Sequence, residues 1–474
     1  MVIHSQIACV GTNSVGDRGS EWLAIATLRS TKTPSDREPP GLGIKLGRSF
    51  GKIRKSWRTT RDWQVSRAIV NGIETIGKGQ QRGTQDDSWP FWPIVPLYPY
   101  RKRVTLRREV VKDTIWTFEQ VQGILYVVVP IRMTVVKLSQ GGLLVYAPVA
   151  PTAECLELLN ELVAAHGEVK YIILPTISGL EHKVFVGPFA RRFPQAQVFV
   201  APQQWSFPLN LPLSWLGFPR SRTQVLPENS SKTPFAEDFD YEILGPLDLG
   251  LGAFGEVAFF HRPSRSLLVT DSVLSVPEAP PAIVNSDPYP LLFHAKDNAT
   301  DAIADSETAR RKGWQRICLF ACYFRPSALE TIEFKQAWRD ARYASDRSKK
   351  AYFGLFPFAW KAHWQRSFEA LRGGGRLFVA PILQKLILNR APKETLDWAD
   401  RVSRWYFERI IPCHFDAAIA AEAHQFRQAF AFLEKQPRWN GNGANLPPED
   451  FEFLTELEEV LDRRGITPPA KTPV

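Results

Sequence analysis

The sequence predicts an α/β protein with a sizeable buried core. Strand-like and helix-like segments alternate from residue 114 onward. Several of the short strands are apolar throughout, which is typical of a sheet covered on both faces. The 474 residues are 44% hydrophobic and 23% charged, an ordinary globular composition that excludes wholesale disorder. This length allows two or three domains, or one large domain with extensions.

The amino-terminal half of the pattern is a hairpin followed by alternating helices and strands. Residues 139–142 (SQGG) are typical of a hairpin turn. An amphipathic helix is predicted over 152–166, because its leucines recur on one helical face. The strands predicted in this half are 114–118, 125–129, 133–138, 143–148, 171–174 and 197–201, and a second helix is predicted at 188–193.

The carboxyl-terminal half alternates in the same way but contains more helices. The strands predicted here are 239–244, 256–261, 266–270, 377–380 and 406–412, and the helices are 303–312, 326–345, 355–372, 393–405, 416–434 and 449–463. The apolar run 317–324 contains Cys318 and Cys322 and fits either one face of a helix or a buried strand.

The amino-terminal region is basic and differs in composition from the rest. Residues 1–88 contain 14 Lys/Arg and 8 Asp/Glu, within a chain of net charge +10. We expect a poorly ordered extension, and the alternative is an arm that binds an anionic surface such as RNA or lipid headgroups. Because no RNA-binding signature accompanies it, we do not expect a nucleic-acid partner. Residues 89–112 begin with a Trp- and Pro-rich stretch that predicts an extended strap across the protein.

Cysteine usage and hydropathy exclude two further classes of protein. Five cysteines in a chain of this length are too few for a disulfide scaffold. They contain no CxxC pair, which excludes a Cys-rich zinc module. No apolar run reaches the ~18 residues that a membrane-spanning helix needs. We therefore expect a soluble protein in a reducing, intracellular compartment.

Candidate chemistry lies where polar side chains follow predicted strands. The sequence has no GxSxG, GxGxxG, GxxxxGK[ST] or HExxH motif. Glu181 and His182 instead follow the strand at 171–174, Asp271 ends the strand at 266–270, and His414 follows the last strand. Ligand-binding residues of layered α/β proteins gather at such strand ends.

This order of elements and motifs resembles the metallo-β-lactamase superfamily. The segments that carry the resemblance are 176–182 (TISGLEH), 251–256 (LGAFGE), 268–271 (LVTD) and 411–414 (IPCH), and it covers residues 114–430. The residues at 89–100, 131–134 and 412–416 resemble those of a divergent branch of this superfamily, a domain of unknown function from cyanobacteria and plants. The resemblance implies a four-layer αββα sandwich of metallo-β-lactamase type. It also implies a cytoplasmic location, or the plastid stroma in a plant.

The resemblance further implies a metal site that has lost half of its ligands. The superfamily's ligands to a first metal fall on Ile177, Gly179 and Gly252, which cannot bind a metal. The superfamily's ligands to the second metal fall on Glu181, His182, Asp271 and His414. Glu181 stands where the superfamily has Asp. These four are acceptable ligands for one zinc, iron or manganese ion. A metal-bound water would then be the candidate nucleophile toward an ester, thioester or phosphodiester.

Two alternatives stay open from the sequence. The site is either a mononuclear metal site or a metal-free relic, in which Glu181, His182, Asp271 and His414 are structural. The protein is correspondingly a hydrolase of a small molecule or a non-catalytic binding or scaffold protein with an unknown partner. Weaker candidates for chemistry are His261, His294 and the thiol of Cys413. The resulting division is 1–88, 89–112, a metallo-β-lactamase-like domain at 113–435 with a helical insertion at about 303–400, and a carboxyl-terminal helix and tail at 436–474.

Overall fold

The computed structural model describes residues 97–474 except 101, 207–209, 251 and 436–445. All of these residues belong to one compact unit. The predicted basic extension at 1–88 and the first part of the predicted strap lie outside the described residues. None of the helices in the described part of the chain is both long and apolar enough to cross a lipid bilayer.

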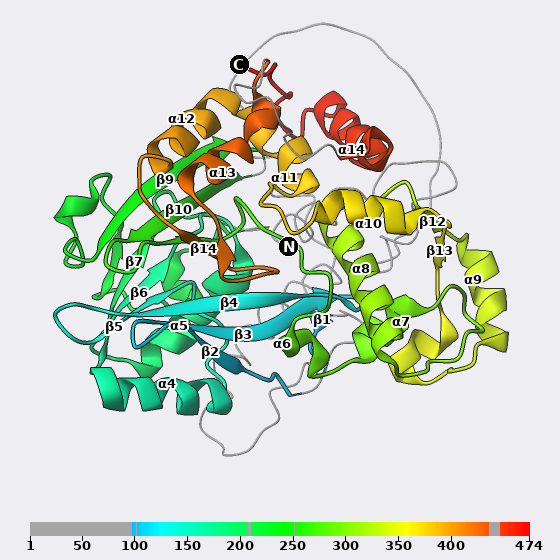
Figure 1. The fold of residues 1–474 in the computed structure, drawn as a ribbon, viewed down its shortest axis with the longest axis horizontal. Helices are drawn as coiled ribbons and strands as arrows, with labels where there is room; N and C mark the ends of the chain where they lie inside the picture. Colours follow the sequence, from blue (N-terminus) through cyan, green and yellow to red (C-terminus); the bar gives the residue numbers. More distant parts are fainter. Residues whose placement is uncertain (1–96, 101, 207–209, 251, 436–445) are drawn as a thin grey trace, which may run out of the picture. The chain divides into compact units, whose positions relative to one another are not determined.

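The first sheet is mixed and contains eight strands (Figure 1). Its order is β1-β3-β4-β5-β6-β7-β8, with β2 paired to β3. The strands up to β5 pair antiparallel, and β5 to β8 pair parallel. Helices α4 (Ala153–His166) and α5 (Leu180–Arg192) connect the parallel strands. The strand bounds are β1 (Leu97–Tyr98), β2 (Leu106–Val111), β3 (Ile115–Ile124), β4 (Val127–Lys137), β5 (Leu143–Tyr146), β6 (Val169–Leu174), β7 (Gln197–Val200) and β8 (Thr223–Val225).

The second sheet has five strands in the order β15-β14-β11-β10-β9. Only the β11–β14 pair is parallel. The strand bounds are β9 (Phe239–Asp248), β10 (Ala253–His261), β11 (Ser266–Val269), β14 (Arg409–Pro412) and β15 (Ile419–Ala420). Residues 416–434, which the sequence analysis assigns to one helix, contain β15 and the shorter helix α13 (Ala423–Gln428). That prediction is wrong because Ile419 pairs with Ile410 of β14, a non-local contact that overrides helical spacing.

Three apolar clusters show that the layers are helix, sheet, sheet and helix. Alternate residues of β5 point to opposite faces: Leu144 and Tyr146 pack between the sheets, and Leu143 and Val145 pack toward α4 and α5. The outer face of the second sheet packs in a third cluster that includes residues of α8, α11 and α12. Figure 1 shows α4 outside the first sheet and α12 outside the second. The predicted αββα sandwich is therefore confirmed.

The segment between β11 and β14 is mostly helical and begins before residue 303. It consists of α6 (Ala282–Asn285), α7 (Tyr289–Ala295), α8 (Glu307–Tyr323), α9 (Phe334–Asp340), α10 (Trp364–Arg372), α11 (Pro381–Leu386) and α12 (Pro392–Val402), with 3-10 turns and a hairpin of β12 (Leu329–Thr331) and β13 (Phe358–Trp360). The ambiguous run 317–324 is the end of α8. The helices predicted at 326–345 and 355–372 are wrong at their starts, because 329–331 and 358–360 pair with each other.

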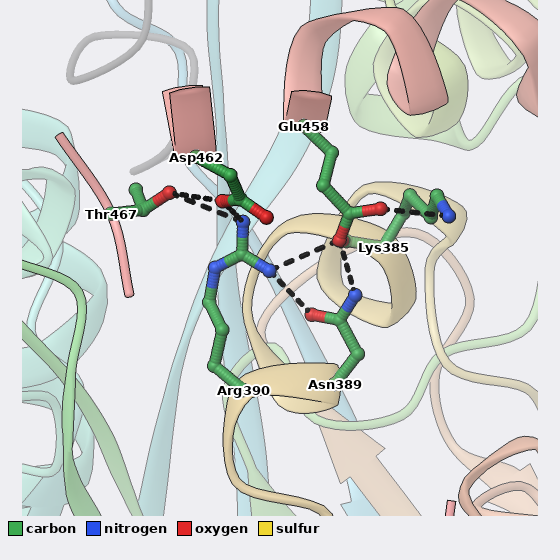
Figure 2. Close-up of polar contacts among 6 residues, drawn as sticks. All are labelled: Lys385, Asn389, Arg390, Glu458, Asp462 and Thr467. Carbon is green, nitrogen blue, oxygen red and sulfur yellow. Dashed lines mark hydrogen bonds and ion pairs between the residues drawn. The ribbon is translucent and has the colours of Figure 1, made fainter. Parts of the chain in front are cut away.

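The chain ends in helix α14 (Glu452–Arg463), which is joined to the body by a buried ionic cluster (Figure 2). The Arg390 guanidinium lies 3.0 Å from both Glu458 and Asp462, and only 1% of its side chain is exposed. Lys385 pairs with the other oxygen of Glu458 at 2.8 Å. Because Arg390 precedes α12 and both acids lie on α14, these contacts connect the carboxyl-terminal helix to the sandwich.

Candidate metal centre

Two of the candidate site residues are brought together by the parallel pairing of β11 with β14. Val269 is in register with Pro412, and Asp271 and His414 each follow two residues later. Parallel strands end at the same edge of a sheet, so the two side chains emerge side by side. Because Asp271 and His414 lie the same number of residues beyond the paired Val269 and Pro412, the register predicts that they are neighbours.

Glu181 reaches the same place from the first sheet. After β6, residues 175–177 cross to the second sheet, where the Val257 amide donates to the carbonyl of Pro175 and the Ile177 amide to that of Gly255. Helix α5 then begins at Leu180, earlier than the predicted helix at 188–193, and places Glu181 in its first turn. A carboxylate in that position interacts favourably with the positive end of the helix dipole.

The ligand atoms of Glu181, Asp271 and His414 lie within 4.8 Å of one another. Nε2 of His414 is 3.5 Å from Oε1 of Glu181 and 3.3 Å from Oδ1 of Asp271. Donors about 2.1 Å from one tetrahedral ion are about 3.4 Å apart, so these two separations suit a shared ion. His182 is not in this group, although its ring centroid is 6.4 Å from that of His414.

Both histidine rings are oriented by backbone carbonyl groups. Nδ1 of His414 is 2.9 Å from the Pro130 carbonyl, and Nδ1 of His182 is 3.2 Å from that of Pro148. A carbonyl only accepts, so Nδ1 carries a proton in each ring and Nε2 is left for another partner. Among the described residues, neither Nε2 atom and neither Glu181 oxygen has a hydrogen-bond partner, although all are buried. Metal-ligating histidines show the same arrangement.

Burial and the nearby carboxylates act in opposite directions on the pKa of each histidine, and a different effect prevails at each. Burial lowers the pKa of His414, but the carboxylates of Glu181 and Asp271 outweigh it and raise this pKa to about 10. Burial lowers the pKa of His182, so that ring is neutral at pH 7. A proton on His414 therefore neutralises part of the carboxylate charge wherever no cation is bound.

Glu256 fixes the turn that carries Asp271, a role that the sequence analysis missed. Its carboxylate is fully buried and accepts four hydrogen bonds of 2.8–2.9 Å, from the amides of Thr270, Asp271 and Ser272 and from the Ser272 hydroxyl. A β-bulge between Phe254 and Glu256 turns this side chain toward the site. The one local signal was an acid inside an apolar strand, at 256–260 (EVAFF).

Arg132 fixes the loop that carries His414 and was also missed. This arginine of β4 is 1% exposed and donates to the carbonyls of Pro412 and Phe415, on either side of His414. Its Nε pairs with Glu119 at 2.9 Å. A buried arginine on a central strand requires such partners, but the sequence alone does not say which residues they are.

Comparison with known families identifies the family to which the chain belongs. Residues 112–432 match a family described as a domain of unknown function, DUF4336. The chain belongs to this family. Among curated proteins, none matches the sequence.

Solved structures that match the DUF4336 chain are flavodiiron cores and metallo-β-lactamases. A fragment of diflavin flavoprotein A 5 from Nostoc sp. PCC 7120 is 10% identical, with 69% of this chain and 94% of that chain covered and a TM-score of 0.36. The Flv1 flavodiiron core from Synechocystis sp. PCC6803 is 9% identical, with coverage of 69% and 60% and a TM-score of 0.35. A metallo-β-lactamase from Pontibacter korlensis is 11% identical, with coverage of 57% and 99% and a TM-score of 0.27.

In this DUF4336 chain, apolar side chains surround Ile177 and Gly252, which the sequence analysis aligned with the superfamily's ligands to a first metal. Ile177 is fully buried, and a Cβ at Gly255 would lie 2.2 Å from its side chain. Gly252 has a φ of +139°, and a Cβ there would lie 2.9 Å from the ring of Trp205. A larger side chain at Gly252 would therefore meet both backbone strain and a steric clash.

Lys183 connects the backbone at Ile177 with that at Trp205. Its ammonium is buried and donates to the carbonyls of Ile177 and Trp205 at 2.6 Å each. Burial lowers the pKa of Lys183 to about 7. The sequence analysis did not single out this residue, because its role depends on two carbonyls that only the folded chain brings within reach.

The weaker candidates lie apart from the group of Glu181, Asp271 and His414. His261 is hydrogen-bonded to Ser264 at 2.7 Å, and His294 lies 3.3 Å from the Leu125 carbonyl among aromatic rings. Cys413 is adjacent in sequence to His414, but it is buried, and burial raises its pKa well above the ordinary value. A thiol with a raised pKa is a poor nucleophile.

Proposed function

We propose that Glu181, Asp271 and His414 hold a single divalent transition metal, with His182 beside them, and that the protein is a metal-dependent hydrolase of an ester, thioester or phosphodiester. The observation that carries the proposal is the convergence of three side chains of metal-ligand type. Two of them, Glu181 and His414, have buried atoms that make no hydrogen bond within the described part of the chain. Unpaired buried polar atoms are costly, and a bound cation would remove that cost.

The donor set determines which metals fit. Two carboxylates and one or two imidazoles suit zinc, iron or manganese and exclude a thiolate site. Such a metal would polarise a carbonyl or phosphoryl oxygen and lower the pKa of bound water. Glu256 and Arg132 hold the ligand loops in place through the contacts described above. Asp271 is the exposed member, at 14% of its side chain, so we expect water and substrate to approach from its side.

Metal binding should release a proton from His414. Because the pKa of His414 is raised to about 10, a metal that uses Nε2 must displace this proton at neutral pH. We expect the apparent affinity for Zn²⁺, measured by chelator competition, to rise about tenfold per pH unit between about pH 7 and pH 9. An affinity that does not change with pH over this range would show that the metal does not use His414.

The same shift predicts how the stability of the metal-free protein depends on pH. The pKa of His414 in the folded protein lies above its ordinary value of 6.5. Its proton therefore stabilises the fold fully below pH 6.5, and this contribution is lost as the pH rises toward about 10. Thermal unfolding of the metal-free protein should show a melting temperature that falls over this window. The fall should be smaller in the variant His414→Ala, which has no such proton.

The decisive experiment is metal analysis of the purified protein after reconstitution with zinc, iron or manganese. We expect about one equivalent in the wild type, and loss of that metal in Glu181→Gln and in His414→Ala. His424→Ala is the matched control, because His424 is exposed and lies outside the site. Wild-type protein without metal after reconstitution would refute the proposal.

Turnover separates a hydrolase from a metal-binding scaffold. The assay compares p-nitrophenyl acetate, an acyl thioester and bis(p-nitrophenyl) phosphate, each with metal-loaded wild type and with Glu181→Gln. Hydrolysis of one substrate class that is lost in Glu181→Gln would support the enzyme. Stoichiometric metal with no hydrolysis of any of the three would leave the metal site intact and refute the hydrolase.

A further inference from the structure

A surface of exposed aromatic side chains lies on the helical segment, away from the candidate metal centre. We call it the aromatic–basic patch, and its aromatic members come from α9, from the 3-10 turn η6 (Ala341–Tyr343) and from η7 (Lys349–Gly354). These members are Phe334, Trp338, Tyr343 and Phe353, with exposed fractions of 37%, 53%, 77% and 61%. Large aromatic side chains with such exposure mark interaction sites when they cluster.

The aromatic members of the patch fall into two pairs, and α9, which carries the first pair, runs directly into η6. The rings of Phe334 and Trp338 lie one helical turn apart, with centroids separated by 6.2 Å. Gly354 packs so closely on the preceding turn that a Cβ there would lie 2.7 Å from the Cβ of Ala344. The residues next to this contact in the chain are Phe353 and Tyr343, so the contact brings their backbones close to each other. Figure 1 shows α9 at an edge of the molecule, on the side away from the first sheet's parallel strands.

The patch carries a positive charge, and four of its cations form no ion pair with the residues that the structure describes. Residues 334–353 contain six Lys/Arg and two Asp. The exposed cations Lys335, Arg339, Arg342 and Arg347 form no ion pair within the described part of the chain. The guanidinium of Arg339 donates only to the neutral side chain of Gln336. The patch therefore suits an anionic partner.

The backbone at the tip of the patch is strained. Tyr352 has φ 49° and ψ 40°, and Phe353 has φ 59° and ψ 27°, so two successive aromatic residues adopt the left-handed conformation. The Tyr352 ring is held by packing against Tyr126 and Phe293. That packing fixes the strained turn, which leaves Phe353 exposed. Strain of this kind persists where the surroundings determine it and is common at ligand-contact sites.

We propose that the aromatic–basic patch docks the protein onto an anionic lipid surface. Trp, Tyr and Phe side chains insert at the headgroup level of a bilayer, and interspersed Lys and Arg contact anionic headgroups. A nucleic acid fits less well, because single-stranded nucleic acids stack on aromatic rings displayed along a sheet or groove. Here the rings come from short helical elements and are exposed at an edge of the molecule.

The test is flotation of the full chain with vesicles of phosphatidylcholine containing 30% phosphatidylglycerol, and with pure phosphatidylcholine vesicles. We expect binding to the anionic vesicles only. Each cation near such a surface contributes about fivefold in binding, so Arg342→Gln/Arg347→Gln should bind about 25-fold more weakly. That difference should disappear in 0.5 M salt, where charges are screened. Trp338→Ser/Phe353→Ser should lose about tenfold.

Matched variants outside the patch keep the test specific. Arg192→Gln/Arg404→Gln removes the same charge from two other exposed positions, and Tyr406→Ser removes an aromatic side chain that is 82% exposed. Both should bind vesicles as the wild type does, and circular dichroism should show every variant folded. Equal losses in patch and control variants, or no wild-type binding, would overturn the proposal. Patch-dependent binding of a fluorescent oligonucleotide without vesicle binding would also overturn it.

Discussion

The variant Glu256→Gln tests whether one buried carboxylate holds the turn of Asp271. The amide keeps the size of the side chain but offers one acceptor oxygen in place of two. Each carboxylate oxygen of Glu256 accepts two of the four hydrogen bonds. In the variant, an NH₂ group replaces one oxygen. At the position of Oε1 it can donate to the Ser272 hydroxyl, which turns to accept, and the Thr270 amide loses its acceptor.

The cost of this change follows from two opposing effects. Hydrogen bonds to a charged group contribute about 1.5–3 kcal/mol each, and those to a neutral group about 0.5–1.5 kcal/mol. One lost bond and the weakening of those that remain therefore cost about 3–6 kcal/mol. Burial, and then the charge of Asp271, raise the pKa of Glu256, which shows that the ionised carboxylate is itself unfavourable there. The neutral amide relieves that part of the cost. We expect a net destabilisation of about 2–4 kcal/mol, which is a large fraction of the usual margin.

Urea denaturation followed by circular dichroism measures this difference, with Glu330→Gln as the control. Glu330 is 62% exposed and pairs with Lys361, so its change should cost less than about 1 kcal/mol. Glu256→Gln should also bind less metal, since the turn of Asp271 loses its anchor. Equal stability of the two variants would refute the assignment of Glu256 as that anchor.

Three further variants test other contacts of the fold. Arg132→Met should lower the free energy of unfolding by about 3–5 kcal/mol in urea denaturation. It should also weaken metal retention, because the guanidinium that donates to the carbonyls of Pro412 and Phe415 is removed. Unchanged metal retention would contradict the role of Arg132. Gly252→His should not restore a second metal equivalent, because the new side chain meets the ring of Trp205; two equivalents by elemental analysis would show that the first-metal position is open. Arg390→Met should leave Asp462 without its ion pair and Glu458 with Lys385 as its remaining cation. The loss should loosen α14, with faster hydrogen exchange there, whereas the exposed substitution Lys393→Met should not.

Local sequence patterns predicted much of the sandwich correctly. Runs such as 171–174 and 197–201 are strands because apolar residues without polar alternation suit a sheet that is buried on both sides. The leucine spacing predicted α4 within one residue of its observed start. Polar residues after strands indicated Asp271 and His414 as candidates, and the parallel register explains why these two residues lie side by side.

Local patterns failed where a partner distant in the sequence decides the structure. Residues 358–360 form a strand despite helical spacing, because 329–331 pairs with them. Helix α5 begins at Leu180 and continues through Pro188, although the sequence analysis started the helix at this proline. A proline inside a helix costs stability, and the burial of eight other residues of α5 offsets that cost. The residues of a single helical turn or a single strand do not contain enough information to predict either outcome.

The sequence by itself determined the alternation of strands and helices and the residue types available to a metal. Only the tertiary structure decided which of them meet: it brought Glu181, Asp271 and His414 within 4.8 Å and left His182 outside that group. It also placed Glu256 and Arg132 where they hold the loops that carry Asp271 and His414. The physical reason is that hydrophobic periodicity is a local property, whereas the partner of a buried charge is set by sheet register and chain crossing.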